Sequence, residues 1–262
     1  QLRLCQNHRQ KRHFDNPPAR WYFLLLRNGE LFYGGRMKIV LTAEEATKAK
    51  DLNVAWMQKW LNAHGAYPTL VVDGDSGSLT RSAIINVFVN KNAQAITQEQ
   101  LQSIARDLGD SNTRRINAVA KVESAGGGWF DSGLPKILYE RHKYWGFTAL
   151  SNRIKSWFAN PSAGDYTTDA NKNGINDSWE KLSLAACKDP LAAFQSVSIG
   201  KFQVMGQWYK QCGFDHPIEM LWAARNDEYA HYKMLRDYIL KVANLQAAFL
   251  KISSNPENCR EF

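Results

Sequence analysis

Hydrophobic residues recur every three or four positions over much of the chain, which is the spacing of amphipathic helices. Within residues 42–95 the pattern predicts two helices, joined by a turn at 71–77 whose glycines can adopt positive φ. The second helix is expected to start near Ser78. The apolar faces should carry Val54, Met57 and Leu61 in the first helix and Leu79, Ala83 and Val87 in the second.

Helical spacing continues beyond residue 96. Thr97 and Gln100 form a capping-box signature that begins a new helix, and Gly109 suits its C-cap. Residues 137–139 are instead typical of a short strand that interrupts the helices. The other predicted helices cover residues 113–124, 151–159, 178–187, 190–197 and much of 218–251.

These elements predict a mainly α protein with two domains, divided near residue 96. Residues 37–95 would form a small three-helix bundle, which is too thin for a large core of its own and should be tethered to a larger partner. Residues 96–262 would form an α-rich domain with a short β-hairpin region. Residues 1–36 show no sustained period and form an atypical basic leader, and our hypothesis is that Met37 is the native start.

Composition supports a globular protein. The chain has 262 residues, of which 44% are hydrophobic and 22% are charged, a balance that excludes disorder. No apolar run approaches the about 18 residues of a membrane span. The longest run near the start, residues 21–26, is shorter than the core of a signal peptide. We therefore expect neither stable membrane insertion nor an export signal.

The formal net charge of +8 would suit a nucleic-acid-binding protein if it were spread over the whole chain. However, residues 1–36 contain seven Lys or Arg against two acidic residues and carry +5 of that charge. Residues 37–262 retain only +3. We therefore predict no nucleic-acid partner, although a modest positive charge suits approach to an anionic polymer.

The sequence lacks the signatures of several enzyme classes. Its four cysteines are far apart, without Cys-x-x-Cys spacing, so free thiols are expected. There is no Gly-x-Ser-x-Gly, His-Glu-x-x-His or phosphate-loop pattern, and the six histidines are scattered, which disfavours a zinc enzyme. We therefore expect catalysis without a cofactor.

Glu123 lies on the apolar face of the predicted helix 113–124, near its C-terminal end. Burial and the negative end of the helix dipole would both raise the pKa of this carboxyl, as a general acid requires. The glycine-rich residues 124–128 come next, and Trp129 can form a wall of the site. Periodicity alone favours the alternative, a glutamate whose stem packs on the core while its carboxylate reaches water.

A second carboxylate, Glu140, comes 17 residues later. If the short strand includes it, Tyr139 and Glu140 face opposite sides, and Glu140 can lie across a cleft from Glu123. Two carboxylates across a cleft are the minimal apparatus of glycoside cleavage. The alternative is an ion pair from Glu140 to Arg141 or to another surface base.

A third candidate segment is 198–206. Asp189 is the expected N-cap of the preceding helix, with Pro190 at its first position. Gly200 allows the backbone to turn closely. The amide of Gln203 offers both a donor and an acceptor to an amide-bearing sugar.

Residues 113–215 resemble the phage-type N-acetylmuramidase catalytic domain of the lysozyme-like superfamily, through segments 122–128, 135–142 and 200–206 in this order. Residues 52–90 resemble the helical peptidoglycan-binding module of many wall hydrolases. Together they are similar to a modular bacteriophage endolysin, from about residue 40 to the end. The second resemblance is carried by Gln58, Leu61, Gly65, Asp73, Gly74, Gly77 and Thr80.

The resemblance implies an enzyme that cleaves the β-1,4 bond between N-acetylmuramic acid and N-acetylglucosamine in peptidoglycan. Glu123 would be the catalytic acid and Glu140 a second acidic residue in the cleft. The predicted substrate-binding residues are Gln203, Tyr139, Trp129 and Ser124.

The resemblance also leads us to expect a lysozyme-like fold, a monomer, and synthesis in the bacterial cytoplasm with passage to the wall through a separate membrane pore. Such domains usually continue into a Tyr-Asn-Gly-type motif, which this chain lacks before Phe262. We therefore predict that the chain is truncated, or that Tyr229, Tyr232 or Tyr238 replaces the missing tyrosine.

Residues 169–180 fit the calcium-loop pattern D-x-[DN]-x-[DN]-G-x5-E in full, with Gly174 at the sharp turn. The ion would be structural, and the alternative is an Asn- and Asp-rich surface turn. The predicted ligands are Asp169, Asn171, Asn173, the carbonyl of Ile175, Asp177 and Glu180.

Two other functions remain open at this point. A lytic transglycosylase would cut the same bond with a glutamate but would use the hydroxyl of the sugar instead of water. A non-catalytic phage protein would only bind the wall. The second carboxylate favours hydrolysis, and the distance between the carboxylates decides between retention and inversion.

Overall fold

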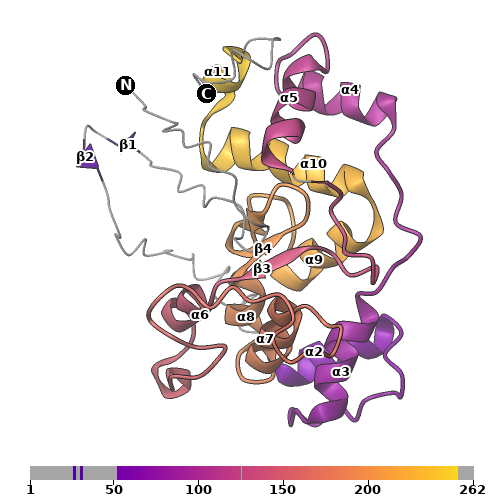
Figure 1. Ribbon diagram of the computed structural model, residues 1–262, viewed down its shortest axis with the longest axis vertical. Coiled ribbons are helices and arrows are strands. Elements are labelled where there is room, and N and C mark those ends of the chain that lie inside the picture. The colour runs from indigo at the N-terminus through magenta and orange to yellow at the C-terminus, as the bar shows by residue number, and fades with distance from the viewer. Residues whose placement is uncertain (1–25, 28–29, 32–51, 125, 253–262) are drawn as a thin grey trace.

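The computed structural model describes residues 26–27, 30–31, 52–124 and 126–252. Our hypothesis about Met37, most of the predicted leader and any helix before residue 52 lie outside these residues. Helices dominate the described chain, as expected (Figure 1). The α-helices are α2 (Val54–Ala63), α3 (Ser78–Val87), α4 (Gln98–Asp107), α5 (Arg114–Glu123), α6 (Arg141–Phe147), α7 (Asp177–Ala186), α8 (Pro190–Gln195), α9 (Pro217–Asn226), α10 (Glu228–Asp237) and α11 (Gln246–Leu250).

Short helices of other types join these elements. They are the 3-10 helices η1 (Leu150–Asn152) and η2 (Gly206–Trp208) and the π-helix η3 (Tyr238–Val242), which continues α10.

A small antiparallel sheet runs through the larger part of the fold, with strand order β3 (Ile137–Tyr139), β4 (Val197–Ile199) and β5 (Val204–Met205). Ile137 pairs with Ile199, and Ile199 pairs with Val204, so β4 and β5 form a hairpin. The sequence predicted a short hairpin region but assigned Val197 to the end of a helix, whereas α8 ends at Gln195 and Val197 begins β4. Two further short strands, β1 (Leu26–Arg27) and β2 (Glu30–Leu31), pair in the leader, where two-residue strands are too short for a sequence pattern to predict.

Capping signals were reliable guides to helix ends. Thr97 and Gln100 form the predicted capping box of α4, and Gly109 has φ +82° directly after that helix. Asp189 accepts a hydrogen bond from the N–H of Ala192, and Pro190 begins α8. These local interactions depend on neighbouring residues only, which is why they could be predicted.

Two predictions of local structure are wrong. Residues 151–159 form no α-helix: after η1 the chain turns back, and Ser156 and Ala159 bond to each other's backbone. The carbonyl of Phe158 is held there by the hydroxyl of Tyr139. Leu79 is 58% exposed and Thr80 is buried in its place, so α3 presents a slightly different face to the core than predicted.

The main hydrophobic core joins the predicted N-terminal module to the C-terminal part of the chain. Trp60 of α2 meets Trp222 of α9 edge-on, with ring centroids 5.4 Å apart, and Phe88 lies 5.4 Å from Trp179 of α7. Figure 1 shows α2 and α3 next to α7, at one end of the molecule. The division into domains at residue 96 stays a prediction, but residues 52–88 share a core with helices α7 and α9.

Arg225 fastens the N-terminal module to α9. Its Nε donates to the carbonyl of Val87 and its Nη2 to that of Val89, each at 3.0 Å. The guanidinium also lies 4.3 Å from the ring centroid of Trp222. The planar guanidinium of arginine is suited to this position, because it can donate to two carbonyls while its face stacks on an indole.

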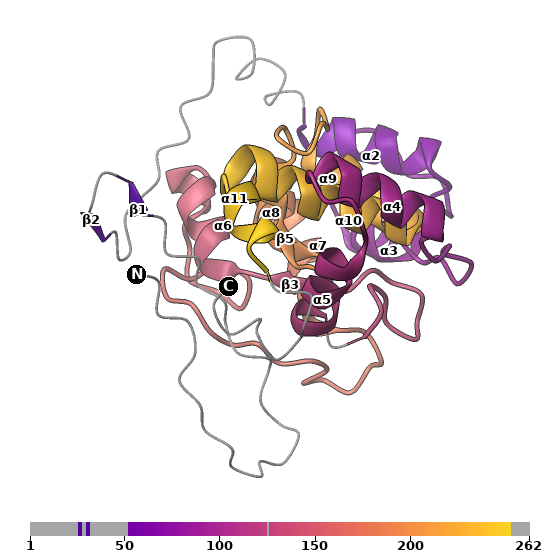
Figure 2. The ribbon, with the colours of Figure 1, turned by 90° about the horizontal axis from the view of Figure 1, so that it is seen from above.

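A second core cluster packs α4 and α5 against α10, η3 and α11, at the other end of the molecule (Figures 1 and 2). Its largest fully buried side chains include Ile104, Leu108 and Phe249. This cluster fixes the helix that ends at Glu123.

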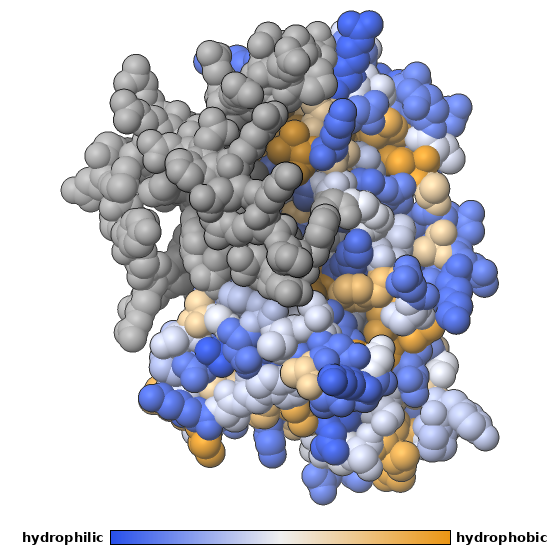
Figure 3. Space-filling model, in the orientation of Figure 1, coloured by the Kyte–Doolittle hydropathy of each residue, from blue (hydrophilic) through white to orange (hydrophobic). Residues whose placement is uncertain are grey.

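On the face shown in Figure 3, the surface of the described residues is mostly hydrophilic, and hydrophobic residues lie in several separate areas. Among the described residues, no helix combines the length and the hydrophobicity that crossing a membrane requires.

Candidate active site

Glu123 is the last residue of α5. Ile116, Val119 and Ala120 of this helix are buried, as the periodicity predicted, and Glu123 lies on the same side, half-buried. Burial raises the pKa of the Glu123 carboxyl above its ordinary value. The side chain therefore meets the electrostatic requirement of a general acid, which is to hold its proton nearer neutrality.

The backbone brings the three predicted segments side by side. The N–H of Lys136 donates to the carbonyl of Gly128 at 2.8 Å, and the N–H of Gly200 donates to the carbonyl of Lys136 at 2.7 Å. The loop after Glu123, the start of β3 and the turn after β4 thus form one ladder. Residues far apart in the sequence are therefore neighbours here.

The turn at 200–203 joins β4 to β5 and carries Gln203. Gly200 has φ +68° and Gln203 has φ +52°, so a non-glycine residue holds a left-handed conformation in this turn. Gln203 is exposed, and its Nε2 donates to the carbonyl of Gly200 at 2.7 Å. Backbone strain of this kind is often found at functional sites.

Helix α10 holds this turn in place. Lys201 forms an ion pair of 2.8 Å with Glu228, and Phe202 packs edge-on against Tyr232 at 4.8 Å between ring centroids. Burial by itself would raise the pKa of Glu228, but hydrogen bonds from Lys201 and from the N–H of Ile96 hold it below its ordinary value. Glu228 is thus an ionised anchor of the turn.

Glu140 lies at the other end of β3, immediately after the strand, as the N-cap of α6. The hydroxyl of Tyr166 donates to its Oε2 at 2.7 Å, and Nδ1 of His142 lies 3.1 Å from the same oxygen. Arg141, the ion-pair partner that the alternative interpretation gave to Glu140, instead lies 3.4 Å from Asp165. The placement of Glu140 across a cleft from Glu123 stays a prediction.

Tyr139 is not positioned to contact substrate, which corrects our prediction. It is 2% exposed, its hydroxyl donates to the carbonyl of Phe158, and burial raises its pKa well above the ordinary value. The strand ends at Tyr139 and does not include Glu140, and the ring of Tyr139 packs within the main hydrophobic core.

Trp129 and Ser124 lie beside the loop that comes after Glu123. The indole of Trp129 is half-buried and packs on the ring of His231, with 4.7 Å between centroids. The hydroxyl of Ser124 donates to the carbonyl of Ala120, one turn back in α5. Both side chains have structural roles, and their contact with substrate stays a prediction.

Two residues of this region had no sequence signal. Tyr166 lies in the long connection before α7, and His231 lies within α10, far from the segments that they contact. Each makes its contact through tertiary packing, so neither spacing nor composition could assign it.

The predicted calcium loop closes on itself through hydrogen bonds. Nδ2 of Asn173 donates to Glu180 at 2.8 Å, and Nδ2 of Asn171 donates to both oxygens of the same carboxylate at 3.1 Å. Gly174 has φ +79°, as the sharp turn requires, and its N–H donates to Asp169.

A cation in this loop would require the two asparagine amides to rotate and present their oxygens. The carboxylate of Asp177 is buried and accepts from the N–H of Ala170, and the carbonyl of Ile175 is the remaining predicted ligand. Among the described residues, no group of three or more His, Cys, Asp and Glu side chains could hold a metal ion. Binding would therefore need neutral oxygens in addition to the carboxylates of the loop, and it stays a prediction.

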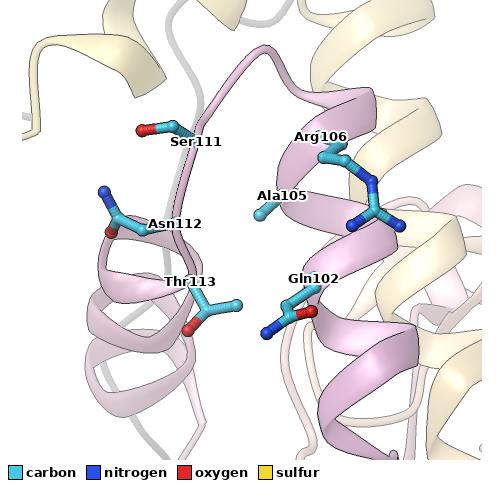
Figure 4. Close-up of a pocket in the computed structure, with 6 residues that line it drawn as sticks. All are labelled: Gln102, Ala105, Arg106, Ser111, Asn112 and Thr113. Atoms are coloured by element: carbon cyan, nitrogen blue, oxygen red, sulfur yellow. The ribbon is translucent and has the colours of Figure 1, made fainter.

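A surface cavity of about 300 Å³ lies between α4 and the start of α5 (Figure 4). It contains no carboxylate, and it lies at the end of α5 opposite Glu123, about 14 Å away along the helix. It is therefore separate from the candidate active site. Its lining residues are Gln102, Ala105, Arg106, Ser111, Asn112 and Thr113.

Comparisons with known proteins give a matching family and a similar solved structure. The sequence profile of the N-acetylmuramidase family matches residues 112–254, more than half of the chain. Among solved structures, the endolysin of Burkholderia phage AP3 superposes with a TM-score of 0.53 and 25% sequence identity, over 75% of this chain and 82% of that chain. No curated protein sequence matches.

Proposed function

Because this chain belongs to the N-acetylmuramidase family and is a peptidoglycan hydrolase, we propose that Glu123 is the general acid of its reaction. The observation that carries the proposal is the half-buried carboxyl of Glu123, because burial raises its pKa. Glu123 ends α5 and lies directly before the loop that is hydrogen-bonded to the start of β3. The bond cleaved is the β-1,4 linkage between N-acetylmuramic acid and N-acetylglucosamine.

The proposed first step is proton transfer from Glu123 to the glycosidic oxygen as the bond to the sugar breaks. Positive charge then develops on the sugar ring, and the departing alcohol retains the proton. The carboxylate left on Glu123 is poorly solvated, so the group regains a proton readily. A raised pKa keeps the acid form available at a pH where an ordinary glutamate is ionised.

Glu140 is proposed to stabilise the positive charge on the sugar or to activate the attacking water. Tyr166 and His142 restrict the rotation of its carboxylate, which favours one fixed orientation. The separation of the two carboxylates during reaction would decide between an inverting and a retaining course.

Gln203 is proposed to contact the acetamido group of the substrate. The exposed amide sits in a strained turn that an ion pair and an aromatic contact hold to α10, so its position is fixed before substrate arrives. Its Nε2 bonds to Gly200, and among the described residues its Oε1 accepts no hydrogen bond, which leaves an acceptor for the N–H of an acetamido group.

Residues 52–90 are proposed to bind the cell wall. Their connection between α2 and α3 exposes large hydrophobic side chains, an arrangement that marks interaction surfaces and suits the apolar faces of sugars. Because Arg225 holds this module to α9, wall binding would place the catalytic site at a fixed distance from the bound glycan. The exposed side chains are Tyr67, Val71 and Val72 in this connection, and Leu79 in the first turn of α3.

We further propose that the protein acts in bacteriophage-induced lysis, reaches the wall through a separate membrane pore, and thereby kills bacteria. Its resemblance to modular endolysins supports this role. The lytic transglycosylase and the purely wall-binding alternatives are not favoured by membership of a muramidase family.

The proposal is tested by measuring the release of reducing sugar from purified peptidoglycan by the wild type, Glu123→Gln and Glu99→Gln. Glu99 is an exposed glutamate in the first turn of α4 and serves as the control. Loss of reducing-sugar release in Glu123→Gln alone, with wall binding retained, supports the assignment. Normal release by Glu123→Gln would refute it.

A further inference from the structure

His231 is a buried residue of α10 that the proposed reaction does not use directly. Its side chain is 2% exposed, and it lies where the loop after Glu123 meets the turn that carries Gln203. No sequence pattern distinguishes it from the other five histidines. Its contacts, however, reach both segments.

Two glycines pack closely against the imidazole, one from the loop after Glu123 and one from the turn that carries Gln203. A methyl group added at Gly128 would lie 2.1 Å from Cε1 of His231, and one added at Gly200 would lie 2.7 Å from its Nδ1. A Cβ atom essentially never comes within 3.0 Å of an atom that it is not bonded to, so both backbones approach the ring more closely than a residue with a side chain would permit. The φ of Gly128 is not in the left-handed region, so contact with the ring is what excludes a side chain there.

Both ring nitrogens of His231 have defined partners. Nδ1 lies 3.0 Å from the N–H of Lys201 and must accept that hydrogen bond, because the amide can only donate. Nε2 lies 2.7 Å from the carbonyl of Ala224 and must therefore carry the proton. These partners require a neutral imidazole in a single tautomer, and burial also lowers the pKa of His231.

We propose that His231 is a positioning residue that sets the loop after Glu123 and the turn carrying Gln203 at a fixed distance from each other. The imidazole acts as a spacer between Gly128 and Gly200 and fastens the turn through Lys201. The inference rests on the proposed function, in which Glu123 supplies the proton and Gln203 contacts the substrate. Its consequence is that the acid and the bound sugar meet in a reactive geometry only while the ring is present and neutral.

The charged groups that face His231 are Glu228 and Asp227 at the start of α10 and Lys201 in the turn. The carboxylates favour protonation of the ring, whereas Lys201 opposes it. A protonated ring could no longer accept from the N–H of Lys201, and the turn would lose this hydrogen bond.

The first test compares two alanine substitutions in the same loop. At Gly127 an added methyl group has no atom of the described residues within 4 Å, whereas at Gly128 it collides with His231, and neither glycine has a left-handed φ. We expect Gly128→Ala to lower kcat on soluble glycan fragments by on the order of 10-fold to 100-fold, and Gly127→Ala to change it by less than about 2-fold. Equal effects of the two substitutions would overturn the proposal.

The second test is a double-mutant cycle with His231→Ala, which removes the ring that Gly128→Ala would strike. If the ring sets the loop, Gly128→Ala should lower kcat strongly in the wild type but by less than about 2-fold in His231→Ala. His231→Asn, which keeps an acceptor near the position of Nδ1, should retain more kcat than His231→Gln. Additive effects of Gly128→Ala and His231→Ala would refute the role of the ring.

Melting temperature and KM are measured on the same samples. A purely structural role would lower the melting temperature and leave kcat per folded molecule unchanged, which would also refute the proposal. If His231→Ala does not fold, the comparison of Gly127→Ala with Gly128→Ala still tests whether the ring positions the loop. The result for Glu123→Gln is independent: normal activity there would refute the proposed acid, whereas the coupling between Gly128 and His231 tests positioning alone.

Discussion

The hydroxyl of Tyr166 donates a 2.7 Å hydrogen bond to Oε2 of Glu140, from a connection that has no regular secondary structure of its own. Its neighbour Asp165 is held by Arg141 at 3.4 Å and by Lys181 at 3.3 Å. An irregular segment is thus anchored where it meets the second carboxylate. This anchoring gives Tyr166 a role in orienting Glu140.

Tyr166→Phe should lower kcat by about 10-fold, because it removes a hydrogen bond to a carboxylate while keeping the ring. Steady-state kinetics on soluble glycan fragments would measure the effect. In a Glu140→Gln background the same substitution should have little further effect, since the two residues act as one unit. Full additivity of the two substitutions would show that Tyr166 acts elsewhere.

Glu123→Gln should stabilise the protein while inactivating it. Burial raises the pKa of Glu123, so its ionised form costs free energy in the folded state at neutral pH. The gain in unfolding free energy should be present at neutral pH and disappear below the ordinary pKa of 4.5, where the carboxyl is protonated whether folded or unfolded.

Chemical denaturation at several pH values measures this difference. Glu99→Gln is the control, because hydrogen bonds from its own backbone and from Thr97 lower the pKa of Glu99, and its replacement should give no gain. A Glu123→Gln variant that is less stable than the wild type at neutral pH would contradict the account.

Arg225→Ala should lower the free energy of unfolding by about 2–4 kcal/mol, because it leaves the carbonyls of Val87 and Val89 without their charged donor. Arg225→Lys should restore little, since lysine lacks the planar guanidinium whose fixed donors reach both carbonyls while its face stacks on Trp222. Urea denaturation measures both variants, with Arg114→Ala as an exposed control. Equal losses in Arg225→Ala and Arg114→Ala would mean that this connection contributes little.

Much of this arrangement could be predicted from the sequence, because helices and caps are local. The helix that ends at Glu123, the capping box at Thr97, the N-cap at Asp189 and the turn at Gly200 were all predicted correctly. Each depends on residues a few positions apart, whose spacing directly encodes backbone conformation.

The failures have a common cause in tertiary packing. Tyr139 ends β3 with its ring in the main hydrophobic core and its hydroxyl on the carbonyl of Phe158, so a predicted substrate contact is a core residue. His231 and Tyr166 meet their partners only after the chain has folded. No periodicity encodes such contacts, so these roles could be found only in the structure.

Binding of Ca²⁺ to the predicted calcium loop can be tested separately. Millimolar Ca²⁺ should produce heat in titration calorimetry and raise the melting temperature, because oxygens of the Asp169–Glu180 loop would bind the ion only in the folded state. Glu180→Gln should abolish both effects, whereas Asp131→Asn, at an exposed position outside the loop, should not. Absence of heat and of any melting shift in the wild type would exclude the site.

The most direct test of the central claim is mass spectrometry of the fragments released from purified peptidoglycan, with Glu123→Gln as control. A muramidase that uses Glu123 as its acid should release fragments with reducing N-acetylmuramic acid ends, and Glu123→Gln should release none. Anhydro ends would instead identify a lytic transglycosylase. Reducing ends released equally by both proteins would contradict the assignment of Glu123.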